Sequence, residues 1–556
     1  MDPLSFEVTR KDVLGRIGTL DTKSGKIETP HLLPVINPLI QPISCKDIFM
    51  NFRCNAVITN AYLISRNFGD EALAKGIHGL LGYDGIVATD SGAYQLLEYG
   101  KVEVQPEEIA RFQEAIGTDI AVILDVPTGW SDKWSIAERT VTETVRRADL
   151  TLKILTKSGI LWEGPIQGGI FIDLVARSAK EMSRRPFDIY SLGSPTPVME
   201  RYMFDKLTDM VMAAKMNLPL SKPLHLFGAG HPLMLALAVA LGCDLFDSAS
   251  YAIFARQGRY LTESGTLKLK DIEYFPCSCP VCQVHTPSEM RELNPVSMEK
   301  RLAEHNLYVC LEEIRRIKQA IVEGRLWELV EIRARSHPSL LQAMETIKKY
   351  SHFIEKHSPS TKTKGLLYLG SHALHRPEIL HHKARLRENY SSPKGSKILL
   401  LLPSLHRASH HSDPQTEALR VICGSKKVHV CTYGSPYGAV PIELSDVYPL
   451  SQTEFRSPMD PETEEYALEQ IREYASSSSY SAIVVHVTND PFGKRMIQML
   501  RRMQRKTKTK LGVSYVGYSP WSSEALEALF ATLGLRGWKR KRAHNRLRCS
   551  DIEPLN

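Results

Sequence analysis

Two aspartates follow short apolar runs in the first half of the chain, where their carboxylates could support chemistry. Asp90 comes directly after Val87-Ala88-Thr89, and Asp247 ends the run that contains Leu245-Phe246. Two carboxylates in one pocket suit displacement at a sugar anomeric carbon, where one attacks a centre with oxocarbenium character and the other manages the leaving group's proton. The pair therefore indicates glycosyl chemistry. Either aspartate alone could instead cap a following helix.

The elements that must position these carboxylates have the pattern of a parallel barrel. Eight short apolar runs in roughly the first 250 residues each end in a polar or glycine-rich stop and are followed by a helix-like stretch. This alternation predicts an α/β fold, a (β/α)8 TIM barrel, whose mouth lies at the carboxyl ends of the strands. The runs end at Asn37, Asn60, Asp90, Asp125, Gly169, Gly193, Gly230 and Asp247.

Other residues at the ends of these strands could bind a flat ring. Asp125 and Gln167 offer an acceptor and a donor suited to the edge of an amide-like heterocycle. Phe227 could stack on the same ring, or it could belong to the core. Small residues would let a ligand come close to the backbone, here Ser91, Gly92, Gly168, Gly169 and Gly193.

Cys277, Cys279 and Cys282 place three thiolates within a single tight turn, which indicates a metal site. The fourth ligand must come from elsewhere. His305, at the start of an apolar helical run, is a better candidate than His285, which lies in the same loop as the cysteines. Sets of thiolates and an imidazole are typical of closed zinc sites, so we expect one structural Zn²⁺ and not a catalytic metal. The alternative is three unrelated cysteines.

Size and composition set further limits. The chain of 556 residues is long enough for a barrel and at least one more domain. It has 24% charged and 43% apolar residues, with no apolar segment long enough to span a bilayer, so we expect a soluble cytoplasmic protein without membrane partners. The ten cysteines form a poor disulfide framework, which fits a reducing compartment. The net charge of +8 is modest for this length.

The pattern changes after the barrel. Residues 286–350 have helical spacing almost throughout, so we expect a helical extension of a catalytic domain that spans residues 1–350, with the zinc-binding insertion at 277–305. Residues 351–396 have a weaker pattern and are interpreted as a linker. Strand-like runs predict a smaller α/β domain over residues 397–556, at 397–403, 427–433 and 482–487.

Two basic runs near the carboxyl terminus could contact nucleic acid. The first contains Arg501, Arg502, Arg505, Lys506, Lys508 and Lys510, and the second spans 536–548 with Trp538 and His544 among its basic residues. Phosphate contacts need clustered Lys and Arg, and exposed rings can stack on bases. A charge run is equally compatible with an ordinary solvated surface.

Together these motifs resemble those of one known family. Over about residues 5–350 the chain is similar to the tRNA-guanine transglycosylases, specifically the archaeal-type tRNA-guanine(15) transglycosylases. The similar stretches follow the family's order and are Asp90–Gly92, Ile123–Val126, Gln167–Gly169, His225–Pro232, Cys243–Arg259, Phe275–Cys282 and Arg333–Pro338.

The resemblance implies an enzyme that exchanges guanine at position 15 in the D-loop of tRNA for 7-cyano-7-deazaguanine (preQ0), a step toward archaeosine, without a nucleotide cofactor. It implies that Asp247 is the covalent nucleophile, that Asp90 is the general acid/base, and that the protein is a homodimer. The implied base-binding residues are Asp125, Gln167, Gly193, Ser194 and Phe227, and the implied zinc ligands are Cys277, Cys279, Cys282 and His305. An intermediate resolved by the incoming base instead of water gives two inversions.

The last part of the chain departs from the family. Family members usually continue into a β-rich RNA-binding module called PUA, and no all-β pattern follows about residue 490. We expect that the basic tail replaces this module or that a separate PUA subunit supplies it. Tyr94 stands where an aromatic residue is usual, and Ser194 where glycine or alanine is common. Two alternative functions stay open: insertion of a deazapurine into DNA by the same barrel, and a non-catalytic RNA-binding subunit.

Overall fold

The computed structural model describes residues 6–93, 104–131, 133–156, 159–403, 414–477, 480–507, 509–515 and 519–535. Tyr94, Lys508 and the basic run at 536–548 lie outside this part of the chain. The described residues form two compact units. The first runs to Lys364 and includes His375–Pro377, and the second comprises Gly365–Leu374 and the residues from Glu378 onward. Among the described helices, none has the length and apolar character needed to cross a membrane.

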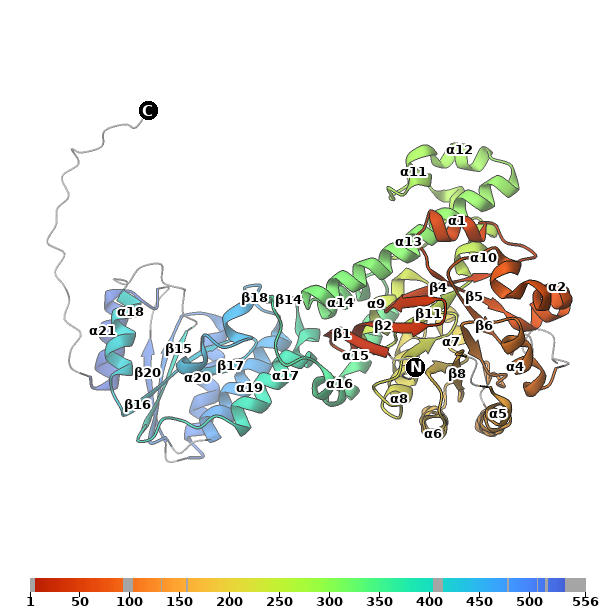
Figure 1. Ribbon diagram of the computed structural model, residues 1–556. Coiled ribbons are helices and arrows are strands. Elements are labelled where there is room, and N and C mark those ends of the chain that lie inside the picture. Colours follow the sequence, from red (N-terminus) through yellow and green to blue (C-terminus); the bar gives the residue numbers. More distant parts are fainter. Residues whose placement is uncertain are drawn as a thin grey trace. The chain divides into compact units, whose positions relative to one another are not determined.

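Eight parallel strands close into a barrel in the first unit, which confirms the predicted (β/α)8 fold (Figure 1). Around the barrel the order is β10, β11, β4, β5, β6, β7, β8 and β9. Their short apolar runs suit strands that are buried on both faces. The bounds are β4 (His31–Ile36), β5 (Ala56–Asn60), β6 (Ile86–Asp90), β7 (Ile120–Val122), β8 (Leu161–Ile166), β9 (Ile189–Leu192), β10 (Leu224–Leu226) and β11 (Leu245–Ser248).

Apolar side chains pack the inside of the barrel, so it is a core and not a pore. Leu33, Ile58 and Ile120 belong to one buried cluster, which Leu20 and Ile27 join from an amino-terminal antiparallel sheet. That sheet consists of β1 (Phe6–Asp12), β2 (Gly15–Thr22) and β3 (Gly25–Glu28). The sequence analysis did not identify it, because most of β1 is exposed and polar and lacks an apolar alternation.

Helices between the strands cover the outside of the barrel. The predicted helix at Pro106–Ala115 is α4, and Glu108 fixes its start by accepting a hydrogen bond from the backbone N–H of Gln105 at 3.0 Å. The other helices of this layer are α1 (Cys45–Met50), α2 (Ala61–Leu81), α5 (Trp134–Ile154), α6 (Ile172–Ser183), α7 (Thr196–Glu200), α8 (Phe204–Lys215), α9 (Pro232–Ala240) and α10 (Ser250–Arg256).

A hairpin and a helical extension follow the barrel. The hairpin pairs β12 (Arg259–Thr262) with β13 (Gly265–Lys268). The long helix α13 (Pro295–Glu323) packs against α9 and α10, as expected for an extension beside the barrel. The remaining elements are η1 (Leu269–Asp271), α11 (Pro280–Val284), α12 (Pro287–Glu292), α14 (Leu326–Ala334), α15 (Pro338–Ile347), η2 (Lys348–Tyr350) and α16 (Ser351–His357).

The second unit is the predicted smaller α/β domain. Its five-stranded sheet has the order β17, β16, β15, β19, β20 and is parallel except for β17. Helices α19 and α20 cover one face and α18 and α21 the other (Figure 1). The sheet and its helices are β15 (Ile398–Pro403), α18 (Pro414–Cys423), β16 (Val428–Gly434), β17 (Gly438–Pro441), α19 (Pro461–Ser477), β19 (Ala482–Val487), α20 (Pro491–Gln504), β20 (Lys510–Tyr515) and α21 (Ser523–Leu533).

Smaller elements complete this unit. A parallel pair of β14 (Leu366–Tyr368) and β18 (Thr453–Phe455) lies outside the main sheet. Residues 351–396, for which we expected a linker, contain α16 of the first unit and then β14, η3 (Ser371–His375) and α17 (Pro377–Glu388). Two short 3₁₀ turns are η4 (Ile442–Leu444) and η5 (Leu450–Gln452).

Candidate active site and metal centre

Asp90 is the last residue of β6, at the carboxyl end of the barrel. Asn60, the last residue of β5, donates from Nδ2 to Asp90 Oδ2 at 3.2 Å. Burial and then the negative charges of Asp125 and Asp247 raise the pKa of Asp90 to about 7, against a hydrogen bond with the backbone of Gly92. A carboxyl group that titrates near neutral pH can both give and take a proton, which is what a general acid/base needs.

The two residues after Asp90 fix the start of the loop that follows β6. Ser91 is fully buried and donates from Oγ to the carbonyl of Ile123 at 3.1 Å. Gly92 has a φ of +92°, and a Cβ at this position would lie 2.3 Å from the Cβ of Tyr62. Only glycine satisfies both conditions, so the close approach expected at this position has a steric basis.

Asp247 lies in β11, and its side chain is 15% exposed. The backbone N–H of Gly228 donates to its Oδ1 at 2.8 Å. The same oxygen lies 3.2 Å from Nε2 of His225, a charge contact without the alignment of a hydrogen bond. Both contacts fall on one oxygen, and they fix the carboxylate from the side of β10.

His225 connects Asp247 to a second carboxylate, that of Glu163 in β8. Its Nδ1 lies 2.8 Å from Glu163 Oε1, and the side chains are 2% and 1% exposed. Burial alone would lower the pKa of His225, but the charge and hydrogen bond of Glu163 and the close contact with the charged Asp247 outweigh it and raise that pKa to about 10. His225 is therefore an imidazolium at neutral pH.

Asp90 and Asp247 belong to the same mouth. In the barrel order β11 and β6 are separated by β4 and β5, and both aspartates stand at the carboxyl ends of their strands. The charge of Asp247 raises the pKa of Asp90, so the two groups lie within electrostatic reach of each other. The mouth thus contains two unlike groups. Asp90 can hold a proton near pH 7, and the carboxylate of Asp247 is held by the imidazolium of His225.

Asp125 and Gln167 form one wall of the mouth. Gln167 donates from Nε2 to Asp125 Oδ2 at 2.5 Å, and its Oε1 accepts from the backbone N–H of Thr128 at 2.9 Å. Asp125 is 4% and Gln167 1% exposed, and burial raises the pKa of Asp125 to about 6 although the bond from Gln167 opposes this. The pair can present an acceptor and a donor edge to a flat ring.

Small residues allow the backbone to lie close to the wall formed by Asp125 and Gln167. A Cβ at Gly193 would lie 2.1 Å from Gln167 Nε2, and one at Gly168, where φ is +140°, would lie 2.6 Å from the nitrogen of Val175. Ser194 has a φ of 60° and donates from Oγ to Gln167 Oε1 at 3.0 Å. Gly193 is therefore required by the position of Gln167.

Phe227 follows β10 and is half-buried. Its ring lies edge-on to His225, with ring centres 4.7 Å apart. This partial exposure favours a ring at the edge of the pocket over a fully buried core position, and the next residue, Gly228, is exposed. The ring is available to stack on a planar ligand near Asp247.

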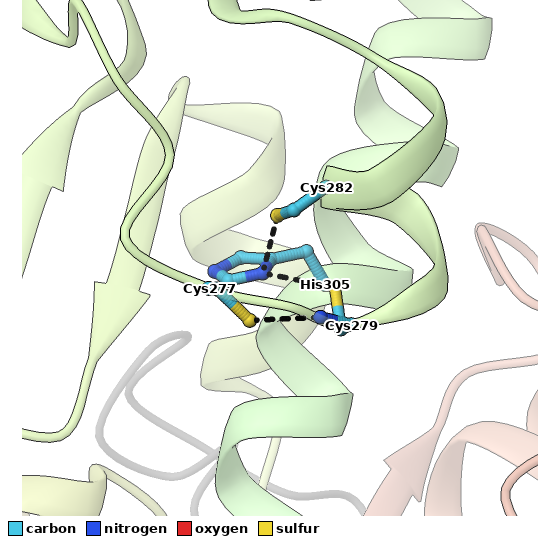
Figure 2. Close-up of side chains that lie close together, drawn as sticks. All are labelled: Cys277, Cys279, Cys282 and His305. Carbon is cyan, nitrogen blue, oxygen red and sulfur yellow. Dashed lines mark hydrogen bonds between the residues drawn. The ribbon is translucent and has the colours of Figure 1, made fainter.

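The three predicted cysteines and His305 converge on one point, as Figure 2 shows. Their ligand atoms all lie within 4.8 Å of one another, with His305 Nδ1 at 3.5 Å from Cys279 Sγ and 3.4 Å from Cys282 Sγ. The cysteines come from the loop before α11 and from α11 itself, and His305 comes from α13. His285 does not belong to this group. The cluster could hold one metal ion.

The surroundings of His305 fit a metal ligand. Its Nε2 lies 3.0 Å from the carbonyl of Leu261, so the ring proton sits on Nε2 and Nδ1 keeps its lone pair for the ion. Tyr260 stacks on the imidazole with ring centres 3.6 Å apart, and its hydroxyl lies 3.3 Å from Cys282 Sγ. The hairpin β12–β13 thus fixes the orientation of the fourth ligand.

Known proteins are similar to this chain in sequence. The family described as queuine tRNA-ribosyltransferase matches residues 12–339. A protein of Methanocaldococcus jannaschii named tRNA-guanine(15) transglycosylase is 44% identical over 468 residues, which are 83% of this chain and 70% of that protein. One of the same name from Sulfolobus acidocaldarius is 39% identical over 485 residues, 86% of this chain and 94% of that protein. The chain belongs to the tRNA-guanine transglycosylase family.

Family membership confirms the resemblance drawn from the sequence and makes this transglycosylase an enzyme of the pentosyltransferase class. A second family model matches the later part of the chain. A family described as a domain of unknown function covers residues 379–533, which lie in the second unit.

The sequence analysis gave no role to four residues that contact the candidate site residues: Asn60, Thr128, Glu163 and His225. Glu163 and His225 lie inside buried strands, and a charged or titratable residue in such a run is itself a signal, because burying it requires a partner. Asn60 ends the second apolar run and could have been found by the same argument as Asp90.

Proposed function

We propose that this transglycosylase exchanges guanine at position 15 in the D-loop of tRNA for preQ0, in archaeosine biosynthesis. The observation that carries the proposal is the pairing of two unlike carboxyl groups at one mouth: Asp90 has a pKa of about 7, and Asp247 is held by Gly228 and His225. Relatives named tRNA-guanine(15) transglycosylase support the choice of position.

The reaction is a double displacement. Asp247 attacks C1′ of the ribose while the bond to guanine breaks, and Asp90 gives its proton to the departing base. The incoming preQ0 then attacks C1′, its ring proton passes to the ionised Asp90, and Asp247 leaves with the electrons of the ester bond. Two inversions return the original configuration. The negative groups of the mouth favour the oxocarbenium character of both transition states.

The base pocket is built from the wall of Asp125 and Gln167. We assign recognition of the flat heterocycle to Asp125, Gln167, Gly193 and Ser194, with Phe227 stacking on its face and Ser91, Gly92 and Gly168 permitting close approach. Gln167 is fixed by three contacts, from Thr128, to Asp125 and from Ser194, so its amide is oriented before the base arrives. A fixed amide loses little entropy on binding.

We propose that the cluster of three cysteines and His305 holds one structural Zn²⁺. Thiolates and a neutral imidazole suit this ion, and with four protein ligands no position is left for water or substrate. The ion would stabilise the junction between the hairpin, α11 and α13 when bound. No step of the exchange passes through it.

We assign catalysis to the first unit and a tRNA-binding role to the second. The end of α20 in the second unit exposes Arg501, Arg502 and Arg505, which suit phosphate contacts. The protein acts in the cytoplasm as a homodimer, because one barrel can catalyse while the other helps to hold a large RNA. A separate PUA subunit completes tRNA binding if the basic tail does not.

An exchange assay tests the proposal. Purified protein is incubated with unmodified tRNA transcript and radiolabelled guanine, with a matched transcript that carries adenine at position 15 and with duplex DNA. We expect label in the first transcript only, and preQ0 should chase it out. No label in any RNA would contradict the proposal, label in the adenine transcript would contradict the position, and label in DNA would favour the DNA alternative.

A further inference from the structure

Exposed aromatic residues and an arginine gather at one side of the barrel mouth. Trp130, in the loop after β7, is 38% exposed, and Tyr202, in the turn between α7 and α8, is 45% exposed. The guanidinium carbon of Arg201 lies 4.3 Å from the centre of the Trp130 ring. The loop after β7 and the segment that leads from β9 through α7 to α8 both start at carboxyl ends of barrel strands, so this platform of Trp130, Arg201 and Tyr202 lies on the face that carries the active site.

The platform is joined to the base pocket through neighbouring residues. The backbone N–H of Gly129 donates to Ser194 Oγ at 3.0 Å, and Ser194 donates to Gln167 Oε1 at 3.0 Å. Adjacent Cα atoms are about 3.8 Å apart, so Trp130 begins one residue beyond the wall of the pocket. Trp130 is therefore a close neighbour of the base pocket.

The segment between β9 and α8 holds Arg201 and Tyr202 in fixed positions. Ser194 and Tyr202 have φ angles of 60° and 55°, which side chains other than glycine rarely adopt. Such conformations persist where the surroundings determine them, and they gather at ligand sites. Tyr202 is held by stacking on His337, with ring centres 4.7 Å apart.

Arg201 keeps its charge available for a ligand. It donates to the carbonyl of Pro197 at 2.9 Å, and within the described part of the chain no carboxylate pairs with it. A guanidinium stacked on an indole offers a flat cationic face together with a free edge. This combination suits a nucleotide, whose base stacks and whose phosphate pairs with the charge.

We propose that Trp130, Arg201 and Tyr202 bind the nucleotide next to the one that reacts. The inference rests on the proposed function and extends it to a second subsite. A base enters the pocket only after leaving its stack, which also strips its neighbour of a stacking partner. The platform supplies a replacement for that partner, in the way that single-stranded RNA is commonly bound.

A fluorescence experiment tests the subsite directly. 2-Aminopurine is placed at either position beside the target guanine in a D-arm RNA, and the protein is added. Stacking on Trp130 should quench one of the two labels, and Trp130→Ala should remove the quenching while Trp130→Phe keeps most of it. Equal fluorescence with wild type and Trp130→Ala at both positions would overturn the proposal, and this readout does not depend on base exchange.

Kinetics supply the second measurement. Trp130→Ala and Arg201→Ala should each raise the KM for tRNA roughly 5- to 100-fold, the range expected for one stacked base, with the KM for free guanine unchanged. Leu73→Ala on the outer helix α2 and Arg184→Ala after α6 are matched exposed controls. Equal changes in both KM values, or changes no larger than in the controls, would overturn the proposal. Failure of wild type to exchange guanine would instead contradict the proposed function.

Discussion

His225 Nε2 lies 3.2 Å from Asp247 Oδ1, and the backbone N–H of Gly228 reaches the same oxygen at 2.8 Å. The other oxygen of Asp247 has neither contact and is the one we expect to attack C1′. The opposite ring nitrogen of His225 lies 2.8 Å from Glu163 Oε1. The imidazolium therefore joins two carboxylates that stand on non-adjacent strands, β8 and β11.

Replacing His225 should affect the chemical step more than binding. His225→Gln keeps a donor but removes the positive charge, so Asp247 loses its fixed position, and we expect kcat to fall roughly 10- to 100-fold. The KM for tRNA should stay near the wild-type value, and Glu163→Gln should act in the same direction more weakly. Steady-state kinetics with tRNA and guanine measure both. A raised KM with normal kcat would show that His225 serves binding instead.

The same residue predicts a pH dependence of stability. The folded-state pKa of His225 is about 10 against an ordinary value of 6.5, because Glu163 and Asp247 outweigh burial. Its stabilising contribution is therefore complete below about pH 6.5 and is lost as the pH rises through about 10. The melting temperature of wild type should fall more steeply from pH 7 to 10 than that of His225→Gln. Parallel curves would mean that His225 is not the stabilising cation.

Replacing Asp90 with asparagine should lower activity but raise stability. Its pKa of about 7 means that kcat/KM for tRNA decreases as the pH rises through that value, because the first step needs the protonated acid. Asp90→Asn should lower exchange at least about 100-fold. Because burial raises the folded-state pKa from 3.8 to about 7, ionisation of Asp90 destabilises the fold increasingly from about pH 4 to about pH 7, and the variant should be more stable at pH 8 by on the order of 1–3 kcal/mol. Denaturant titrations at pH 8 and pH 4 should show this gain only at pH 8.

Gly193→Ala should weaken binding of the free base. The added Cβ would lie 2.1 Å from Gln167 Nε2, so the amide must move away from Asp125. We expect the KM for guanine to rise by at least roughly 10-fold, the loss that follows when buried polar groups are left unpaired. Gly69→Ala on α2, where a Cβ meets nothing within 4 Å, is the control and should behave as wild type. A normal KM for guanine in Gly193→Ala would exclude Gln167 from base recognition.

Removing a metal ligand should reduce stability and metal content together. Cys282→Ser and His305→Ala should lower bound zinc from one ion per chain toward none and reduce the melting temperature, because the loop before α11 loses its tie to α13. Cys45→Ser, a half-buried cysteine outside the cluster, is the control. Metal analysis and thermal unfolding measure both effects. Wild-type protein that is fully stable and contains no zinc would contradict the structural role.

Much of the fold could be read from local patterns. Each barrel strand is a short apolar run with a polar stop, and the stops at Asp90, Asp125 and Asp247 mark the mouth because all parallel strands end on the same side. The metal cluster could also be predicted, because three cysteines within one turn restrict where a shared metal ion can lie. The amino-terminal sheet could not be predicted, because β1 is polar and gains its place by pairing with β2 and packing against α13.

The fine geometry of the site could not be read in this way. Glu163 and His225 stand 62 positions apart, and nothing local indicates that they meet until the barrel closes. The same holds for Trp130 and Arg201, which belong to loops after different strands. To predict such contacts, one must know which residues of neighbouring strands lie side by side in the closed barrel. The spacing of residues along the chain does not give this register.

Capture of the intermediate tests the central claim most directly. End-labelled tRNA is mixed with enzyme in the absence of free base, the reaction is quenched with denaturant, and peptide mass spectrometry locates the ribose attachment. We predict an adduct on Asp247 that guanine or preQ0 discharges and that Asp247→Asn does not form. An adduct on Asp90, or full exchange by Asp247→Asn, would contradict the account.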